Sequence, residues 1–278
     1  WGIAIKSEDK KEEALTERCI DQLLDAIRNG ASRDDPEAVQ WILGALSSLA
    51  SSAGNRRAIT EQKGIEAILE IMKRHERVPC VYEWGCRVLF SLIGGYEEGD
   101  GDSDAFERQI SIIEDYGGIR VIVETMKLHL SESAPILWAL KVLLRMQDRM
   151  DPNNVARSVQ LMNDDDLSVP CIRVINAKVS PDVVLHSQVM LLYLISHSAN
   201  ETMQQQAVDC IPSVLKIIAE NPNQPDLVEV SAEFLTEISR NDFRAKRKIA
   251  DNNGARTVVG CMSSYSDNLS VQRALVSL

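Results

Sequence analysis

A recurring pattern of apolar positions runs along the chain. A small residue is followed by apolar residues one, four, five and eight positions later, as in Gly64-Ile65…Ile68-Leu69…Met72. Spacings of three and four residues place such side chains on one face of an α-helix. We therefore expect an amphipathic helix at each copy, and the copies begin at Cys19, Gly64, Gly118, Cys210 and Gly254.

A second signature follows each of these copies before the next one begins. It is a leucine with another large apolar residue three positions later, at Leu46/Leu49, Leu89/Leu92, Leu143/Met146, Leu235/Ile238 and Leu275/Leu278. Self-similarity at a period of about 40 to 50 residues is typical of solenoids built from stacked helices. The two signatures therefore predict a repeated helical unit that presents a long surface.

A third, shorter amphipathic segment precedes the pair from the second unit onward. We expect short helices over residues 55–62, 105–115, 154–162, 201–209 and 243–252. Several of them end in glycine, which supplies the left-handed conformation for a sharp turn. The first unit has only two helices, over 16–29 and from Pro36, where Asp35 provides an N-cap before the proline.

The pattern resembles the armadillo-repeat family. The matching residues are Gly64-Ile65, Gly118-Ile119 and Gly254-Ala255, with the third-helix stretches 45–50 and 88–92. The resemblance implies an all-α fold, a right-handed α-solenoid of about six armadillo-type three-helix repeats. Paired-helix HEAT repeats are the structural alternative, and the recurring short helix with its glycine favours the armadillo type.

The expected organisation is one array behind a short lead-in. Residues 1–16 form a charged lead-in, residues 94–104 an acidic insertion, and residues 17–278 a single array. The fourth unit has two possible registers, one that begins at Cys171 and an earlier one near Asp166. The expected units are 17–52, 53–95, 96–149, 150–199, 200–242 and the truncated 243–278.

Composition narrows the classes of partner and compartment. With 30 basic and 41 acidic residues, the net charge of −11 argues against general nucleic-acid binding. The six cysteines include no CxxC pair, and Cys19, Cys171, Cys210 and Cys261 occupy apolar helical positions. Buried free thiols in a reducing compartment, the cytoplasm, are therefore expected. No apolar run is long enough for a transmembrane helix.

Tryptophan recurs five positions before the leucine of the second signature in three consecutive units. These residues are Trp41, Trp84 and Trp138. In the armadillo family the third helices line the concave groove, so one interpretation is an aromatic stripe flanked by Arg87, Lys141 and Arg145. Trp and Arg are the residue types most enriched at binding hot spots. The other interpretation is that each tryptophan packs in the core.

The second half of the expected groove is acidic. Glu229, Glu233 and Glu237 follow one another at four-residue spacing on one helix face, where a basic partner would relieve their repulsion. Nuclear-import adaptors place tryptophan two residues before the leucine and asparagine two residues after it. Neither is present at these positions, which argues against that class. The predicted groove residues are Trp41, Trp84, Arg87, Trp138, Lys141, Arg145, Tyr193, Glu233 and Glu237.

No motif indicates chemistry. Residues 100–104 resemble the start of a calcium loop, but Ala105 and Ser111 stand where an EF-hand needs glycine and glutamate. The histidines lack metal-ligand spacing, and neither a phosphate-binding loop nor a catalytic triad signature occurs. We therefore expect no metal, no cofactor and no enzymatic activity.

The expected function is a cytoplasmic scaffold or adaptor that binds proteins or peptide segments through its groove. The near-bare array is similar to the armadillo-repeats-only family of apicomplexan parasites. That resemblance implies peripheral attachment through an acylated N-terminus, the cytosolic face of an organelle, and a motor or signalling partner. The sequence shown has no such N-terminal acylation residues. A regulatory or autoinhibitory armadillo domain of a larger multidomain protein is the alternative.

Overall fold

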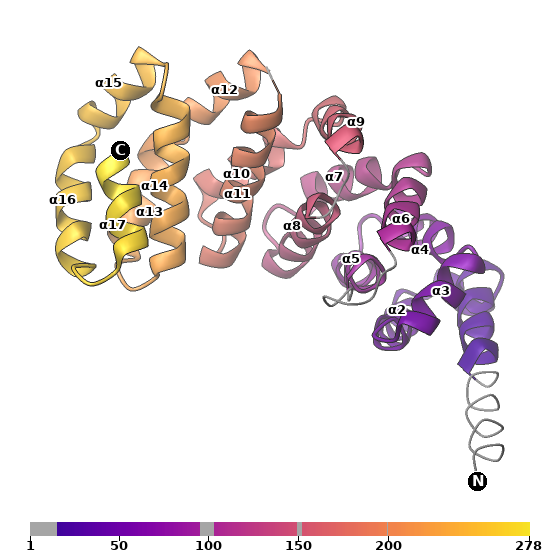
Figure 1. Ribbon diagram of the computed structural model, residues 1–278. Helices are drawn as coiled ribbons and strands as arrows, with labels where there is room; N and C mark the ends of the chain where they lie inside the picture. The colour runs from indigo at the N-terminus through magenta and orange to yellow at the C-terminus, as the bar shows by residue number, and fades with distance from the viewer. Residues whose placement is uncertain (1–15, 95–102, 149–151, 199) are drawn as a thin grey trace, which may run out of the picture. The chain divides into compact units, whose positions relative to one another are not determined.

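The computed structural model describes residues 16–94, 103–148, 152–198 and 200–278 (Figure 1). Within these ranges all regular structure is helical and no strand occurs. The predicted lead-in lies outside the described residues apart from residue 16, and so does most of the predicted acidic insertion. The described residues form an all-helical fold of the α-solenoid type.

The helices group into two compact units, each with its own set of contacts. The first unit runs from the helical residues 16–28 to α8. Its other elements are η1 (Ala31–Asp34), α2 (Pro36–Leu49), α3 (Ala53–Glu61), α4 (Gly64–Arg74), α5 (Pro79–Ile93), α6 (Ser103–Asp115), α7 (Gly118–Leu128) and α8 (Ser133–Gln147).

The second unit runs from α9 to α17 and includes residues 130–133, which lead from α7 into α8 and contain the first residue of α8. Figure 1 shows α13, α14, α16 and α17 side by side within it, in agreement with the contacts between these helices. Its elements are α9 (Pro152–Asp164), α10 (Ser168–Ala177), α11 (Pro181–His197), α12 (Glu201–Val208), α13 (Ile211–Glu220), α14 (Pro225–Ser239), α15 (Phe243–Asp251), α16 (Gly254–Ser264) and α17 (Leu269–Ser277).

From α3 onward the helices follow one another close to the predicted segments, and we name them short, middle and long by their place in that order. The long helices α5, α8, α11 and α14 have 15 to 17 residues and exceed the two helices before each of them. The prediction that the first helix is the shortest is wrong for α6 and α9, which have 13 residues each against 11 in α7 and 10 in α10.

The middle and long helices supply most of the core. The leucines of the second signature lie on the long helices and point inward. These leucines, Leu46, Leu89, Leu143, Leu235 and Leu275, are at most 1% exposed, and so is Leu191, which has the equivalent place on α11. The repeat type, the handedness, the count of six and the single array remain predictions.

Sharp turns before the middle helices explain the recurring glycines. In three of the repeats a residue in the left-handed conformation precedes the middle helix, with φ of 56° at Lys63, 68° at Gly117 and 59° at Asn253. The glycine that follows packs against an isoleucine of the short helix. A Cβ on Gly64 would lie 2.4 Å from the Ile59 side chain and 2.6 Å from its carbonyl oxygen. The predicted motif therefore reflects close packing as well as the turn.

The same kind of turn decides the register of the fourth repeat. Asp166 has a φ of 56°, and α10 begins two residues later, at Ser168, with Leu167 as its N-cap residue. The earlier of the two predicted registers, near Asp166, therefore applies, and Cys171 lies inside the helix. Asp and Asn adopt the left-handed conformation more readily than most other non-glycine residues.

The predicted buried thiols are correct for Cys171, Cys210 and Cys261 but wrong for Cys19, which is exposed. Ile20 and Leu24 occupy the inward face of helix 16–28, and a residue one position earlier points about 100° away from that face. No helix in the described part of the chain is long and apolar enough to cross a membrane.

Candidate functional site

The three tryptophans predicted to lie in the groove occupy equivalent places on α2, α5 and α8 of the first unit. The Trp41 side chain is 70% exposed, and Trp84 and Trp138 are half-buried. All three are therefore reachable from solvent to some degree. The interpretation that each tryptophan is a core residue does not describe Trp41.

Cationic side chains alternate with the half-buried tryptophans. The Arg87 guanidinium carbon lies 4.6 Å from the ring centroid of Trp84 and 4.6 Å from that of Trp138. The Lys141 Nζ lies 4.7 Å from the Trp138 centroid. We call these four residues (Trp84, Arg87, Trp138 and Lys141) the tryptophan–cation ladder. Cation–π attraction holds the side chains in this order.

Two neighbours that sequence reasoning missed complete the ladder. The Phe90 ring meets the Trp138 ring edge-on, with centroids 5.6 Å apart. The Glu83 carboxylate accepts a hydrogen bond from Arg87 Nη2 at 2.6 Å. The sequence did contain a signal for both residues, namely their position along the chain. Phe90 directly follows Leu89, the leucine of the second signature, which we call the marker leucine, and Glu83 directly precedes Trp84.

Ion pairs reduce the predicted basic character of this surface. Arg87 is paired with Glu83, and Arg145 contacts Asp148 at 3.1 Å. Across the described ranges, Lys141 has no carboxylate partner. Its ammonium is thus the cation of the ladder whose charge is not neutralised by a neighbour.

The surface that each tryptophan ring contacts is set by the residue two positions before the marker leucine. This residue is Gly44 in α2 and Arg87 in α5. The Trp84 ring lies against Gly44, 3.7 Å from the place of a Cβ there. On α8 the equivalent residue, Trp138, lies against the Arg87 side chain and not against a glycine. Each tryptophan therefore contacts the long helix that precedes its own.

We expect Arg87→Met to destabilise the first unit by about 1–2 kcal/mol, because methionine keeps the aliphatic packing but loses two cation–π contacts and an ion pair. Lys141→Met, which removes one cation–π contact, should cost less than about 1 kcal/mol. Urea unfolding followed by tryptophan fluorescence measures both. An equal loss of unfolding free energy in the two variants would contradict the placement of Arg87 between two tryptophan rings.

The predicted acidic residues lie on the second unit. Glu237 pairs with Arg240 at 2.8 Å, and Glu229 accepts a hydrogen bond from the Ser270 hydroxyl at 2.7 Å. Glu233 is exposed between them. The three carboxylates line a groove of about 490 Å³ whose other lining residues include Leu192, Thr236, Arg273 and Ser277. The predicted repulsion along the helix is therefore partly relieved by the protein itself.

Tyr193 has a different environment from these glutamates. Its ring stacks on the His197 ring with centroids 4.3 Å apart, and partial burial raises the pKa of the phenol. It is not among the residues that line the acidic groove. The structure therefore places Glu233 and Glu237 on one groove, which Leu192, the chain neighbour of Tyr193, also lines.

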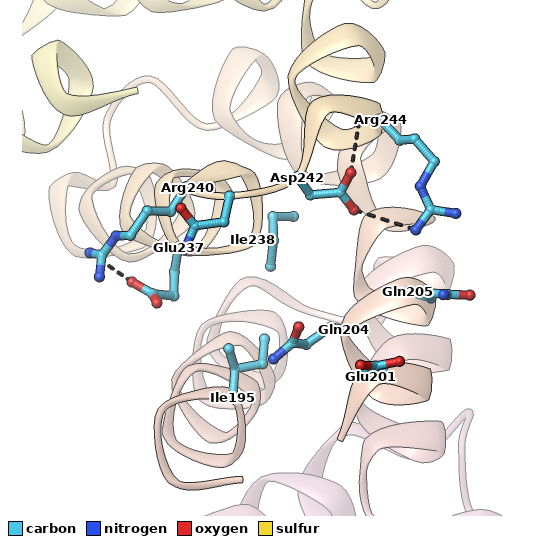
Figure 2. A pocket seen from close by; sticks show the side chains of 10 residues that line it. Ile195, Glu201, Gln204, Gln205, Glu237, Ile238, Arg240, Asp242 and Arg244 are labelled. Atoms are coloured by element: carbon cyan, nitrogen blue, oxygen red, sulfur yellow. Dashed lines mark hydrogen bonds and ion pairs between the residues drawn. The ribbon is translucent and has the colours of Figure 1, made fainter. Parts of the chain in front are cut away.

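A second hollow, of about 480 Å³, was not anticipated from the sequence. Figure 2 shows Glu237 beside Arg240, and the Asp242 carboxylate directed at both the backbone and the guanidinium of Arg244. The charged side chains of this hollow thus largely satisfy one another. The remaining lining residues are Ile195, Glu201, Gln204, Gln205, Ile238 and Asn241.

The buried thiols are held in their neutral form. Burial raises the pKa of Cys210 to about 12 and the pKa of Cys86 and Cys171 well above the ordinary value. A thiol is a poor nucleophile and metal ligand when protonated at neutral pH. Among the residues that the structure describes, no group of three or more His, Cys, Asp or Glu side chains could hold a metal ion.

No protein-family model matches the chain, and no curated protein matches it. Among solved structures, the chain is similar to the crystal structure of an engineered protein from the Northeast Structural Genomics Consortium. The TM-score is 0.65 at 17% sequence identity, over 93% of this chain and 94% of that chain. At this identity the likeness shows the fold alone.

Proposed function

We propose that this protein is a non-catalytic scaffold of the armadillo-repeat type that binds partner proteins or peptide segments through the surface of its long helices. The observation that carries the proposal is the tryptophan–cation ladder with Trp41 beside it in the first unit. Its contact residues would be Trp41, Trp84, Arg87, Trp138, Lys141 and Arg145, with Tyr193, Glu233 and Glu237 as the second unit's contribution.

The ladder has the physical properties of a binding hot spot. Aromatic and arginine side chains give large contact areas, and a surface fixed before binding loses little conformational freedom on association. Arg87 is fixed between two indoles, and both tryptophans remain partly exposed. Trp41, which is 70% exposed, offers apolar area to a partner without any change in the fold.

The net charge and the free cysteines support the proposed class of partner and the proposed compartment. A net charge of −11 disfavours nucleic acid as the partner. Six free cysteines suit a reducing compartment, and we accordingly propose a cytoplasmic protein. Attachment to the cytosolic face of an organelle would be a special form of the same scaffold function.

Selection from a random peptide display library, followed by affinity measurement, tests the proposal. We expect peptides that bind the wild-type chain and lose at least tenfold in affinity with Trp41→Ala and with Lys141→Glu. Trp41 is exposed, so its replacement should leave the melting temperature unchanged.

Lys216→Glu is the matched control, because it makes the same charge change on α13 of the second unit, where Lys216 contacts Glu220 at 3.5 Å. It should alter the affinity by less than about twofold. Selected peptides that bind all four proteins equally would refute the ladder as the binding surface.

A further inference from the structure

A cleft with an excess of positive charge lies on the first unit, built by elements other than the ladder. Its volume is about 260 Å³. Helix 16–28 contributes its last turn, η1 contributes one arginine, and α4 contributes its C-terminal half. The lining residues are Ile27, Arg28, Arg33, Glu70, Ile71, Lys73 and Arg74.

Neutral carbonyl groups hold two of the arginines in place. Arg28 Nη2 donates to the carbonyl oxygens of Gln62 and Lys63, the latter at 2.9 Å. Arg33 Nη1 donates to the carbonyl oxygen of Arg28 at 2.9 Å. Both arginines are half-buried, and neither has an ion pair within the described ranges. Their guanidinium groups are therefore fixed in position while their charges stay uncompensated.

The other two cations add to this charge. Arg74 pairs with Asp34, while Lys73 is exposed and has no carboxylate partner in the part of the chain that the structure describes. The buried Nε of Arg33 has no hydrogen-bond acceptor. Glu70 is the carboxylate that lines the cleft. The four cations thus exceed the two nearby carboxylates, in a chain whose net charge is −11.

We propose that this cleft binds a small ligand that carries more than one phosphate group, of the inositol-phosphate headgroup class. Phosphate oxygens accept charge-assisted hydrogen bonds from guanidinium groups, and the planar fork of arginine matches their geometry. A doubly charged phosphate would neutralise Arg28 and Arg33, and a second phosphate would reach the exposed Lys73. This proposal is independent of the scaffold function, because the cleft shares no residue with the ladder.

Isothermal titration calorimetry of the full chain with inositol 1,4,5-trisphosphate and with inorganic pyrophosphate tests the proposal. We expect saturable binding that weakens as salt rises, because added ions screen the attraction. Lys73→Glu should weaken the binding at least fivefold. Arg33→Gln is the second variant, with its fold verified by circular dichroism.

Lys127→Glu is the matched control. Lys127 occupies the equivalent place at the end of α7, directly after Met126 as Lys73 follows Met72, and it pairs with Glu124 at 2.9 Å. Its replacement should change the affinity by less than about twofold. Equal weakening by Lys73→Glu and Lys127→Glu would assign the binding to overall charge and overturn the proposal.

Flotation with vesicles that contain phosphatidylinositol bisphosphate separates the two sources of the headgroup. Binding to these vesicles that soluble inositol trisphosphate displaces, and that Lys73→Glu abolishes, would identify the lipid as a ligand. Binding of the soluble compounds alone would identify a free phosphate ligand. Absence of binding to the soluble compounds and to the vesicles would overturn the proposal.

Discussion

Replacement of Gly64 by alanine is expected to destabilise the first unit by about 2–3 kcal/mol, although alanine is the better helix former. The added Cβ would meet the Ile59 carbonyl oxygen at 2.6 Å and its Cγ2 at 2.4 Å. The carbonyl belongs to the backbone of α3, so the clash can be relieved only by a shift of α3 against α4. Such a shift also disturbs the packing of both helices.

Gly260→Ala is the control that isolates close packing from helix propensity. Gly260 lies inside α16, and apart from its chain neighbours and the backbone of its own helix nothing lies within 4 Å of the place where its Cβ would stand. Alanine should therefore stabilise the second unit by about 0.5–1 kcal/mol. Tryptophan fluorescence reports the first unit, which contains Trp41, Trp84 and Trp138, and calorimetry reports both units. Stabilisation by Gly64→Ala would show that the glycine serves only the turn.

The second large effect is expected at Arg56, an arginine that is only 3% exposed. Its Nη1 donates to the carbonyl oxygens of Ala50 at 3.2 Å and Ser51 at 3.0 Å, just beyond the last residue of α2. Arg56→Ala leaves these carbonyls without that donor and opens a cavity. We expect a loss of about 2–4 kcal/mol in the free energy of unfolding.

Arg57→Ala is the neighbouring control with the same change in charge. Arg57 is exposed on α3, and its loss should change the free energy of unfolding by less than about 0.5 kcal/mol. Urea unfolding of both variants, followed by tryptophan fluorescence, gives the comparison. If the two substitutions had equal effects, Arg56 would act through its charge and not through the carbonyl groups at the end of α2.

Local signals in the sequence were sufficient to locate the helices. The apolar spacing and the proline caps predicted the long helices, and Asp35 accepts the expected hydrogen bond from the Glu37 amide at 3.1 Å. The short helices begin within about two residues of their expected positions, because apolar residues recur there at three- and four-residue spacing, as at Phe106, Ile110 and Ile113. The fourth register required backbone angles, since Leu167 follows the left-handed Asp166, whereas glycine follows the left-handed residue in the three other repeats that have this turn.

Contacts between neighbouring repeats within the first unit could be predicted less well than the helices themselves. The repeat position predicted that Trp84, Arg87 and Trp138 are neighbours, but not that the arginine lies between the two rings. The basic cleft escaped detection because Arg28 and Arg33 stand about 40 residues before Lys73 and Arg74, and separations of that size are invisible to helical periodicity. The exposure of Cys19 was missed because Cys19 lies inside helix 16–28, whereas the equivalent Gly64, Gly118 and Gly254 begin their helices and pack against the short helix before them.

Hydrogen-exchange mass spectrometry of the full chain, with and without a peptide selected on it, tests the scaffold proposal most directly. Binding at the ladder should slow exchange in α2, α5 and α8, since a bound partner suppresses local opening of the helices that it contacts. Protection confined to the middle helices α4 and α7, with α2, α5 and α8 unchanged, would contradict the account.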